Sequence, residues 1–224
     1  MSRYSVAILG ASGLVGQRLQ ELLYNHPFFE VVAIAGSPKH VGLMFEEIEW
    51  RLDSLRPDYD ILICSMSDIP DVDITFSALP SNVAEIVEPS LVARGIHVFS
   101  NASAFRRVAG IPLVIPEINP EAMQAYEGHA CATNCTVVPV VMPIKGLLPL
   151  GIKSVTIQTR QALSGAGWRL LSDESALAGD VNPFIQGEEE KLIAEFKHLL
   201  NLEIPVIASC NRVPHRDGHF VSCG

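Results

Sequence analysis

Short apolar runs alternate with longer amphipathic stretches along the first hundred residues of the chain. The run Tyr4–Leu9 leads directly into three glycines, after which apolar residues recur at helical spacing. Further runs of strand length lie at Phe29–Ala35, Asp73–Ala78 and Gly95–Ser100, each followed by small or polar residues. Strands separated by helical stretches predict an α/β fold with an open parallel sheet.

The second half begins with a polar tripeptide and a cysteine ahead of an apolar run of helix length, ATNCTVVPVVMPIKGLLPLG from Ala132. Pro139 and Pro143 argue against a straight, uninterrupted helix in this run. We therefore expect two domains, with the parallel sheet in residues 1–133 and a partial α+β domain in residues 134–224.

Composition and charge narrow the possible partners. With 224 residues and 48% hydrophobic residues, the chain can fill a sizeable core. Its formal net charge of -9 argues against binding to nucleic acid or to anionic lipid, which both favour a basic face. No apolar run approaches the roughly 18 residues of a membrane span, and MSRYSVAILG does not resemble a signal peptide. We expect a cytoplasmic protein that binds small molecules and has no membrane contact.

The five cysteines are odd in number and widely scattered, which does not suggest a disulfide framework and fits a reducing compartment. Cys131 and Cys135 are accompanied by no Cys-x-x-Cys pair, and the histidines lack metal-ligand spacing. We predict no metal site.

Gly10, Gly13 and Gly16 stand between the first strand and the first helix. Glycines there let the backbone turn sharply and approach a pyrophosphate, while the helix N-terminus offers unpaired N–H groups to the anion. The alternative is a glycine-rich turn without a ligand. The strand-turn-helix context favours dinucleotide binding by a Rossmann-type sheet.

The segment Gly36–His40 follows the second strand, where an NAD-binding protein usually places an acidic residue on the ribose hydroxyl. No acidic residue stands there. Ser37 and Lys39 could instead bind a 2′-phosphate, so we predict NADP as the cofactor; the alternative is a solvated turn lysine. Ser81 and Asn82, after a later strand, fit equally well as cofactor-lining residues or as helix caps.

Cys135 precedes the apolar helical run, and a cysteine at a helix start is predicted to have a lowered pKa and thus reactive thiolate character. Free cysteines are more often core residues than nucleophiles. Three further motifs favour the catalytic interpretation: QALSGAG from Gln161, GEEEK from Gly187, and NRVPHRDGH from Asn211.

In this order, GxxGxxG, TNC, QxxSGAG, GEEEK and RVPxxDGH resemble the aspartate-semialdehyde dehydrogenase family, in its archaeal and fungal branch. The resemblance covers essentially the whole chain. It implies a catalytic and dimerisation domain after the Rossmann-type domain, and NADP-dependent, reversible conversion of L-aspartate 4-semialdehyde and inorganic phosphate to 4-aspartyl phosphate, a step of lysine, threonine and methionine biosynthesis.

The resemblance also implies residue roles. Cys135 would be the nucleophile, His219 the general acid/base, and Asn134 and Gln161 would position the substrate. Arg212 and Glu188 would hold the substrate's carboxylate and amine, and Lys191 and Arg106 the phosphate. Strand-end position and resemblance together assign the cofactor site to Gly10, Ser12, Gly13, Leu14, Val15, Gly16, Ser37, Lys39, Ser77, Leu79, Pro80, Asn101, Ser164 and Gly165.

Each polar residue also has a purely structural alternative. Glu188 and Lys191 could be a helix-surface pair, worth about 0.2–0.5 kcal/mol. Arg212 could be a surface residue, and His219 a partner of Asp217 or of the backbone. The residues from Gln161 to Gly167 could form an ordinary strand-to-loop turn.

The chain departs from the family pattern in two places. It ends five residues after His219, where the family continues, so we expect a C-terminally shortened chain with an unpaired sheet edge. Such an edge predicts instability or a homo-oligomer, either a homodimer or a homotetramer. The sequence that begins with Trp168, after the SGAG glycines, departs from the aromatic-proline-glycine sequence of this branch. Two other functions stay open: a malonyl-CoA reductase, and an inactive NADP-binding homologue.

Overall fold

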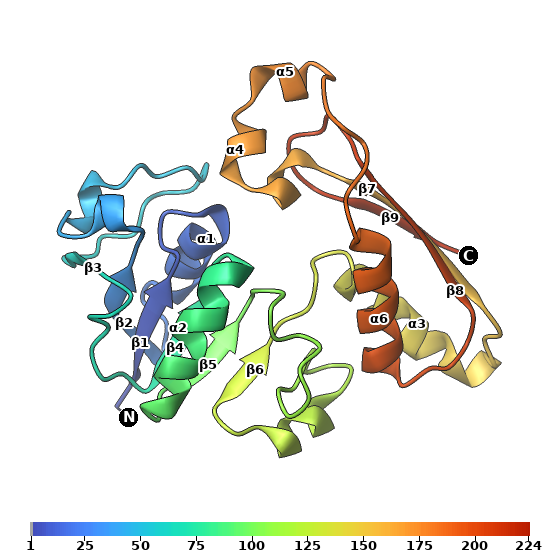
Figure 1. The fold of residues 1–224 in the computed structure, drawn as a ribbon, viewed down its shortest axis with the longest axis horizontal. Helices are drawn as coiled ribbons and strands as arrows, with labels where there is room; N and C mark the ends of the chain where they lie inside the picture. Colours follow the sequence, from blue (N-terminus) through green and yellow to red (C-terminus); the bar gives the residue numbers. More distant parts are fainter. Residues whose placement is uncertain (1) are drawn as a thin grey trace. The chain divides into compact units, whose positions relative to one another are not determined.

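The computed structural model describes residues 2–224, which divide into two compact units (Figure 1). The first comprises residues 2–112 and Ala125–Ala132, and the second comprises Leu113–Gln124 and Thr133–Gly224. The domain boundary predicted after residue 133 differs from this division by the segment Leu113–Gln124 and by Thr133. Whether either unit is a functional domain stays a prediction.

The first unit is built on a six-stranded parallel sheet with the order β3-β2-β1-β4-β5-β6. This is the strand order of a doubly wound dinucleotide-binding sheet, in which the order reverses between β1 and β4. The predicted Rossmann-type α/β sheet is thus confirmed. Its strands are β1 (Tyr4–Leu9), β2 (Phe29–Ala35), β3 (Ile63–Cys64), β4 (Ile74–Ser77), β5 (His97–Ser100) and β6 (His129–Cys131).

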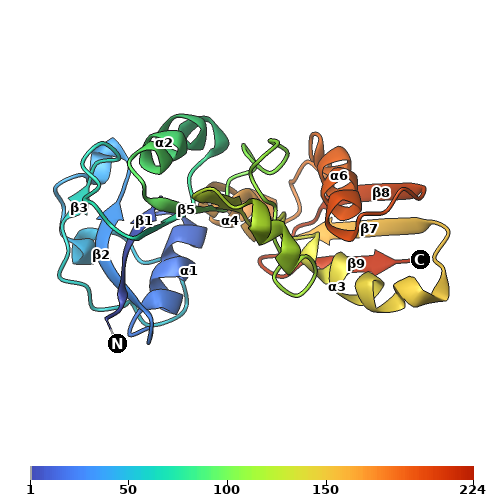
Figure 2. The same cartoon turned by 90° about the horizontal axis from the view of Figure 1, so that it is seen from below.

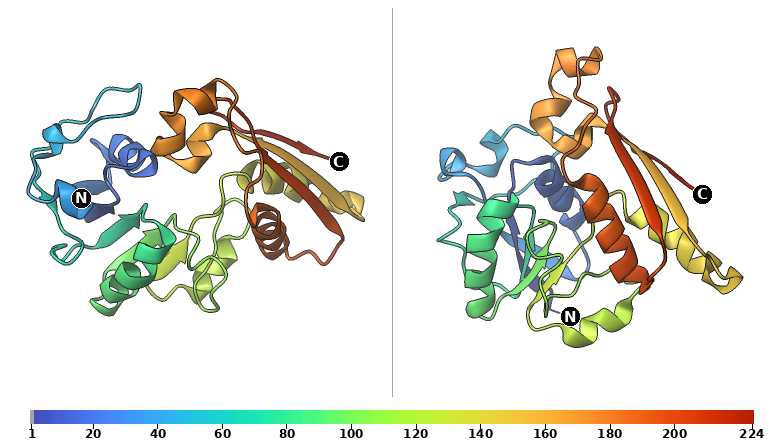
Figure 3. Two further views of the ribbon diagram at one scale, coloured as in Figure 1. Left: turned by 45° about the horizontal axis from the view of Figure 1, so that its top comes forward. Right: turned by 45° about the vertical axis from the view of Figure 1, so that its right-hand side comes forward.

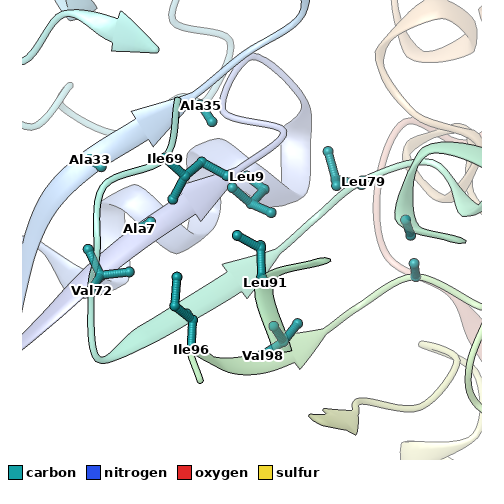
Figure 4. Packing of buried hydrophobic residues seen from close by; sticks show 12 residues of the cluster. Ala7, Leu9, Ala33, Ala35, Ile69, Val72, Leu79, Leu91, Ile96 and Val98 are labelled. Carbon is teal, nitrogen blue, oxygen red and sulfur yellow. The ribbon is translucent and has the colours of Figure 1, made fainter. Parts of the chain in front are cut away.

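Apolar side chains on both faces explain why β1 lies in the centre of the sheet. Ala7 and Leu9 join one buried cluster (Figure 4), and Val6 and Ile8 join the cluster on the opposite face. Since successive side chains of a strand alternate between faces, such a run must be covered on both sides. Helices α1 (Leu14–Leu23) and α2 (Ser81–Ala93) lie on opposite faces of the sheet (Figure 2).

The second unit contains a three-stranded mixed sheet with the order β8-β7-β9, in which β7 pairs parallel with β8 (Val206–Arg212) and antiparallel with β9 (Phe220–Cys223). The strand β7 (Val155–Gln161) alternates strictly between buried and exposed residues, so only one face is covered. Helix α6 (Glu188–Leu200) packs against β8 and α3, and α3 (Val138–Leu147) packs against β9 (Figure 3). The expected α+β second domain is confirmed.

Helix α3 is uninterrupted, contrary to the expectation from its prolines. Pro139 lies in the first turn, where a main-chain N–H has no helical partner to lose. Pro143 is inside the helix and is tolerated there. The remaining short elements are the single-turn helices α4 (Trp168–Leu171) and α5 (Glu174–Leu177), and the 3-10 turns Pro38–His40, Phe45–Glu47, Pro120–Ala125, Leu148–Leu150 and Leu163–Ala166.

Two chemical features complete the description of residues 2–224. None of the helices has both the length and the apolar character needed to cross a bilayer. Within the same residues, no disulfide joins any of the five cysteines, and no cluster of three or more His, Cys, Asp or Glu side chains could hold a metal ion.

Candidate active site

The glycine turn after β1 is shaped by close backbone approach. Gly10 has a φ of +78°, and a Cβ atom added to it would lie 2.5 Å from the carbonyl oxygen of Ala78, at the end of β4. A Cβ on Gly16 would lie 2.2 Å from the carbonyl oxygen of Gly10. Helix α1 then starts with Gly13 as its N-cap, without a side-chain cap or an acidic residue in its first turn. This geometry leaves the helix N-terminus suited to a pyrophosphate.

The carboxyl ends of β4 and β5 meet beside this turn. Leu79 and Pro80 follow β4, and the main-chain N–H of Asn101, after β5, donates to the carbonyl oxygen of Ser77 at 2.8 Å. Arg106 donates through Nη2 to the carbonyl oxygen of Asn101, also at 2.8 Å. The loop that carries Arg106 is therefore fastened to the edge of the sheet where a dinucleotide would bind.

The helix-cap interpretation of Ser81 and Asn82 is wrong. Helix α2 already includes both residues, and its N-cap is Pro80, whose carbonyl oxygen accepts the first helical hydrogen bonds. The hydroxyl of Ser81 instead lies 2.9 Å from that of Ser103.

Basic side chains gather beyond β2. The hydroxyl of Ser37 lies 3.3 Å from Nδ1 of His40, and Lys39 is exposed between them. Burial lowers the pKa of His40, and the positive charges of Lys39 and Arg51 lower it further. Arg51 also donates through Nη1 to the carbonyl oxygen of Ser12 in the glycine turn, at 3.1 Å. Arg51 lies 39 residues from Ser12 in no recognisable motif, so its place at the glycine turn could not be predicted from the sequence.

The loop that carries Cys135, called the cysteine loop below, precedes α3. Cys135 is exposed and stands two residues before Val137, the N-cap of α3. That the helix dipole lowers the pKa of its thiol stays a prediction. The neighbouring Asn134 is buried and its amide is held at both ends. Its Nδ2 donates to Oε1 of Glu188 at 2.8 Å, and its Oδ1 accepts from the N–H and hydroxyl of Thr136 at 3.0 and 3.1 Å.

Two buried carboxylates of α6 hold this loop. Glu188 and Glu195 are two helical turns apart, which places both on the same face of the helix. Oε1 of Glu188 accepts from Asn134 and also from Nε2 of Gln161, the latter at 2.9 Å. Oε2 of Glu195 accepts the main-chain N–H of Asn134 at 2.7 Å. Glu195 was missed in the sequence because its partner is a main-chain group, which leaves no mark on residue type.

The end of β7 brings Arg212 and His219 to the thiol. Gln161 pairs with Arg212 on β8, while Arg160 pairs with Phe220 on β9, directly after His219. Nε2 of His219 lies 3.3 Å from Sγ of Cys135. The structure therefore brings together six residues identified from the sequence: Asn134, Cys135, Gln161, Glu188, Arg212 and His219.

Main-chain groups of the turn after β7 fix both basic side chains. The carbonyl oxygen of Ala162 accepts from Nη1 of Arg212 at 2.6 Å, and the N–H of Ala162 donates to Nδ1 of His219 at 3.0 Å. A Cβ on Gly165 would lie 2.9 Å from both Nη1 of Arg212 and Cε1 of His219. The hydroxyl of Ser164 donates to Asp217 at 2.7 Å. Ser164 and Gly165, expected at the cofactor, are thus packed around the two catalytic candidates.

Burial and charge set the protonation of these groups. Burial lowers the pKa of His219, as does the positive charge of Arg212, whereas Asp217 and Glu188 raise it. Burial also lowers the pKa of Arg212, opposed by Glu188 and Cys135. Since arginine ordinarily titrates far above neutral pH, Arg212 remains a cation.

The two residues expected to bind phosphate belong to different units. Arg106 lies in the first unit and Lys191 in the second, in the first turn of α6.

Comparison with known proteins identifies the family. Residues 5–126 match the model for the NAD binding domain of semialdehyde dehydrogenases. The aspartate-semialdehyde dehydrogenase of Archaeoglobus fulgidus is 40% identical over an alignment that covers 97% of this chain and 70% of that protein. The chain belongs to the aspartate-semialdehyde dehydrogenase family. The predicted branch is confirmed as well, because the family member from Candida albicans is 33% identical, with coverages of 98% and 70%.

The fold of the family extends over the whole chain. The crystal structure of aspartate-semialdehyde dehydrogenase with NADP from Candida albicans superimposes with a TM-score of 0.85 at 31% identity, covering 100% of this chain and 71% of that one. That family member was therefore solved with the cofactor predicted from the sequence of this chain.

Proposed function

We propose that this chain catalyses the reversible, NADP-dependent oxidation of L-aspartate 4-semialdehyde by way of a thioester on Cys135, with inorganic phosphate as the acyl acceptor and 4-aspartyl phosphate as the product. This reaction serves lysine, threonine and methionine biosynthesis. The observation that carries the proposal is the contact between Sγ of Cys135 and Nε2 of His219 at 3.3 Å, in a chain of this family.

Cys135 acts as the nucleophile. Its side chain is exposed, so an aldehyde can reach it, while the loop beneath is fixed through Asn134. A fixed loop holds the sulfur where attack on a bound carbonyl carbon needs no rearrangement. His219 acts as the general acid/base, taking the proton of the thiol or of the thiohemiacetal that forms when Cys135 attacks the aldehyde.

Arg212 and Glu188 recognise the amino-acid part of the substrate. Arg212 uses one of its five N–H groups for Ala162, so the others remain for a planar carboxylate. Asn134 and Gln161 both donate to Oε1 of Glu188. Among the described residues no hydrogen bond to Oε2 is found, which leaves that oxygen for the substrate's ammonium group.

Lys191 and Arg106 hold the phosphate that cleaves the thioester. Both side chains are cations. Each lies near a proposed binding residue, Glu188 for Lys191 and Asn101 for Arg106. Lys191 is three residues beyond Glu188 on α6, and Arg106 is bonded to the loop after β5. A lysine ammonium and an arginine fork are each suited to an anion with several oxygens.

The residues of the first unit fit NADP. The backbone approach at Gly10 supports pyrophosphate binding, and the basic residues beyond β2 support a 2′-phosphate. A cavity of about 680 Å³ lined by Gly36, Pro38, Met66 and Ile86, among others, offers room for the adenosine part. When bound, the oxidised nicotinamide accepts the hydride released by the substrate adduct.

We also propose that the chain self-associates, as a homodimer or homotetramer. One face of the sheet β8-β7-β9 is exposed, and its edge strands carry the exposed apolar residues Ile207 and Phe220. Light scattering coupled to size-exclusion chromatography measures the mass directly.

A phosphate-dependent assay tests the function. NADPH formation is followed with L-aspartate 4-semialdehyde, with and without phosphate, and the reverse direction is followed with malonyl-CoA as an alternative acyl substrate. NADPH formation only in the presence of both semialdehyde and phosphate supports the proposal. Binding of NADP without any turnover would instead identify an inactive homologue, and turnover of malonyl-CoA alone would identify a malonyl-CoA reductase.

A further inference from the structure

Helix α2 carries a buried carboxyl group that has no role in the proposed reaction. Glu88 is completely buried where α2 packs against β5 (Figure 1). Its Oε1 accepts from the hydroxyl of Ser100, the last residue of β5, at 2.8 Å, and its Oε2 lies 3.0 Å from Nε2 of His129, the first residue of β6. Burial of a carboxyl group is strongly destabilising unless its oxygens have partners. These three residues form a buried network, called the Glu88 network below.

Ser100 connects Glu88 to the loop that follows β5. Its hydroxyl oxygen accepts the main-chain N–H of Ala102 at 3.1 Å. Since a main-chain N–H can only donate, the hydroxyl accepts at this contact and its single proton is directed to Glu88. A continuous series of hydrogen bonds therefore runs from the loop through Ser100 to α2.

His129 holds the same loop at a second point. The ring centroid of Phe105 lies 4.7 Å from that of the His129 imidazole. Phe105 directly precedes Arg106, whose Nη2 donates to the carbonyl oxygen of Asn101 at 2.8 Å. The loop 101–106 is therefore attached to the Glu88 network near both of its ends.

We propose that the residues of the Glu88 network are positioning residues for Arg106, and thereby set the affinity for the phosphate that cleaves the thioester. The inference rests on the proposed function, in which Arg106 binds that phosphate. The cofactor should be affected much less, because Asn101 is fixed separately: its main-chain N–H donates to the carbonyl oxygen of Ser77 at 2.8 Å.

Removal of one hydroxyl tests the network. Ser100→Ala deletes the acceptor of the Ala102 N–H and the donor to Glu88. It should raise KM for phosphate about 3–10-fold, the typical worth of one hydrogen bond. The dissociation constant of NADP and KM for the semialdehyde should change little. Thr75→Val is the matched control, because the hydroxyl of Thr75 is also buried, in the neighbouring strand β4, but makes no hydrogen bond within residues 2–224.

A conservative substitution at Glu88 provides the rescue. Glu88→Gln keeps a carbonyl oxygen for Ser100, and its amide group donates to His129 when the ring adopts the other tautomer. It should retain a nearly unchanged KM for phosphate, whereas Glu88→Ala should raise this KM at least as much as Ser100→Ala does. Equal values of this KM in Glu88→Gln and Glu88→Ala would contradict positioning by these hydrogen bonds.

A double-mutant cycle separates positioning from general stability. If the network acts through Arg106, Ser100→Ala should have no further effect on KM for phosphate once Arg106→Ala is present. A merely structural role would produce the same loss in both backgrounds, or would weaken the binding of phosphate, semialdehyde and NADP together. Either result would refute the inference.

Phosphate binding can also be measured without turnover. Inorganic phosphate is titrated into the full chain while nitrogen-15 NMR follows the side-chain N–H of Arg106, assigned by comparison with Arg106→Ala. Its dissociation constant should rise about 3–10-fold in Ser100→Ala. An unchanged constant, or no response of Arg106 to phosphate, would refute the inference. A chain that shows this rise but does not oxidise the semialdehyde would refute the proposed function alone.

Discussion

Cys135 and His219 are 84 residues apart in the sequence, yet Sγ and Nε2 are 3.3 Å apart. The contact depends on the second unit alone. Antiparallel pairing of β7 with β9 places His219 at the end of β7, and the α6 carboxylates fix the cysteine loop through Asn134. The register of the sheet and one face of α6 therefore bring Cys135 and His219 together.

The first prediction concerns the replacement of Cys135, the proposed nucleophile. Cys135→Ser should reduce turnover to background and leave NADP binding nearly unchanged, because a hydroxyl occupies similar space but lacks a thiolate's nucleophilicity. Cys223→Ser is the matched control, since Cys223 is another exposed free thiol of the same unit. Substantial residual turnover in Cys135→Ser would remove this residue from the mechanism.

Cofactor preference should depend on the charge beyond β2. Lys39→Glu is expected to weaken NADPH binding roughly tenfold, about 1.4 kcal/mol, while NADH binding changes little. The side chain is exposed, so the effect should shrink at high salt. Titration of cofactor fluorescence gives both dissociation constants, with Lys153→Glu, another exposed lysine, as the control. Equal loss for both cofactors would contradict a 2′-phosphate contact.

Some of this architecture follows from sequence, and some does not. The strands β1 and β2 were predicted with their observed bounds, because each carries an apolar run long enough to need burial on both faces. The outer strands β3 and β6 have two and three residues, too few to show any periodicity.

Some groups of the candidate site could likewise be predicted from the sequence, and others could not. Motif residues such as Arg212 were identified because their type and order are distinctive. The N–H of Ala162 and the carboxylate of Glu195 were not, because a main-chain hydrogen bond can be made beside almost any residue type. Sequence patterns therefore identified the side chains that are proposed to face a substrate, and missed the groups that orient them.

Glu195 should be a positioning residue for the cysteine loop. Glu195→Ala leaves the buried N–H of Asn134 without its acceptor, which should cost about 1–3 kcal/mol in the free energy of unfolding and lower kcat. Glu195→Gln retains an acceptor oxygen and should recover most of both losses. Urea unfolding and steady-state kinetics measure the two effects. Equal kcat values for the two variants would exclude a positioning role.

The pH dependence should reflect the lowered pKa of His219. Protonation of His219 should limit activity on the acid side, so the acid limb of kcat/KM, which reports the free enzyme, should lie below the ordinary histidine value of 6.5. Asp217→Asn removes an anion that raises this pKa, and should move the limb to still lower pH while retaining an acceptor for Ser164.

The same pKa shift has a consequence for stability. Because the unfolded chain binds the proton more readily than the folded one, the folded state should lose stability as pH falls through 6.5 toward the lower folded pKa. Above 6.5 this penalty is absent. For the activity profile, an acid limb that moves to higher pH in Asp217→Asn would show that a group other than His219 limits activity.

Arg212→Lys should separate substrate binding from chemistry. The lysine keeps the charge but loses the planar fork that matches a carboxylate, so KM for aspartate semialdehyde should rise about 10–100-fold, corresponding to about 1.5–3 kcal/mol for a charged hydrogen bond. KM for phosphate should change little, since Lys191 and Arg106 are proposed to bind it, and it serves as the internal control. Some loss of kcat is expected too, because Arg212 also donates to Ala162, whose N–H orients His219. A fall in kcat with an unchanged KM for the semialdehyde would mean that Arg212 supports the turn after β7 and does not anchor the substrate.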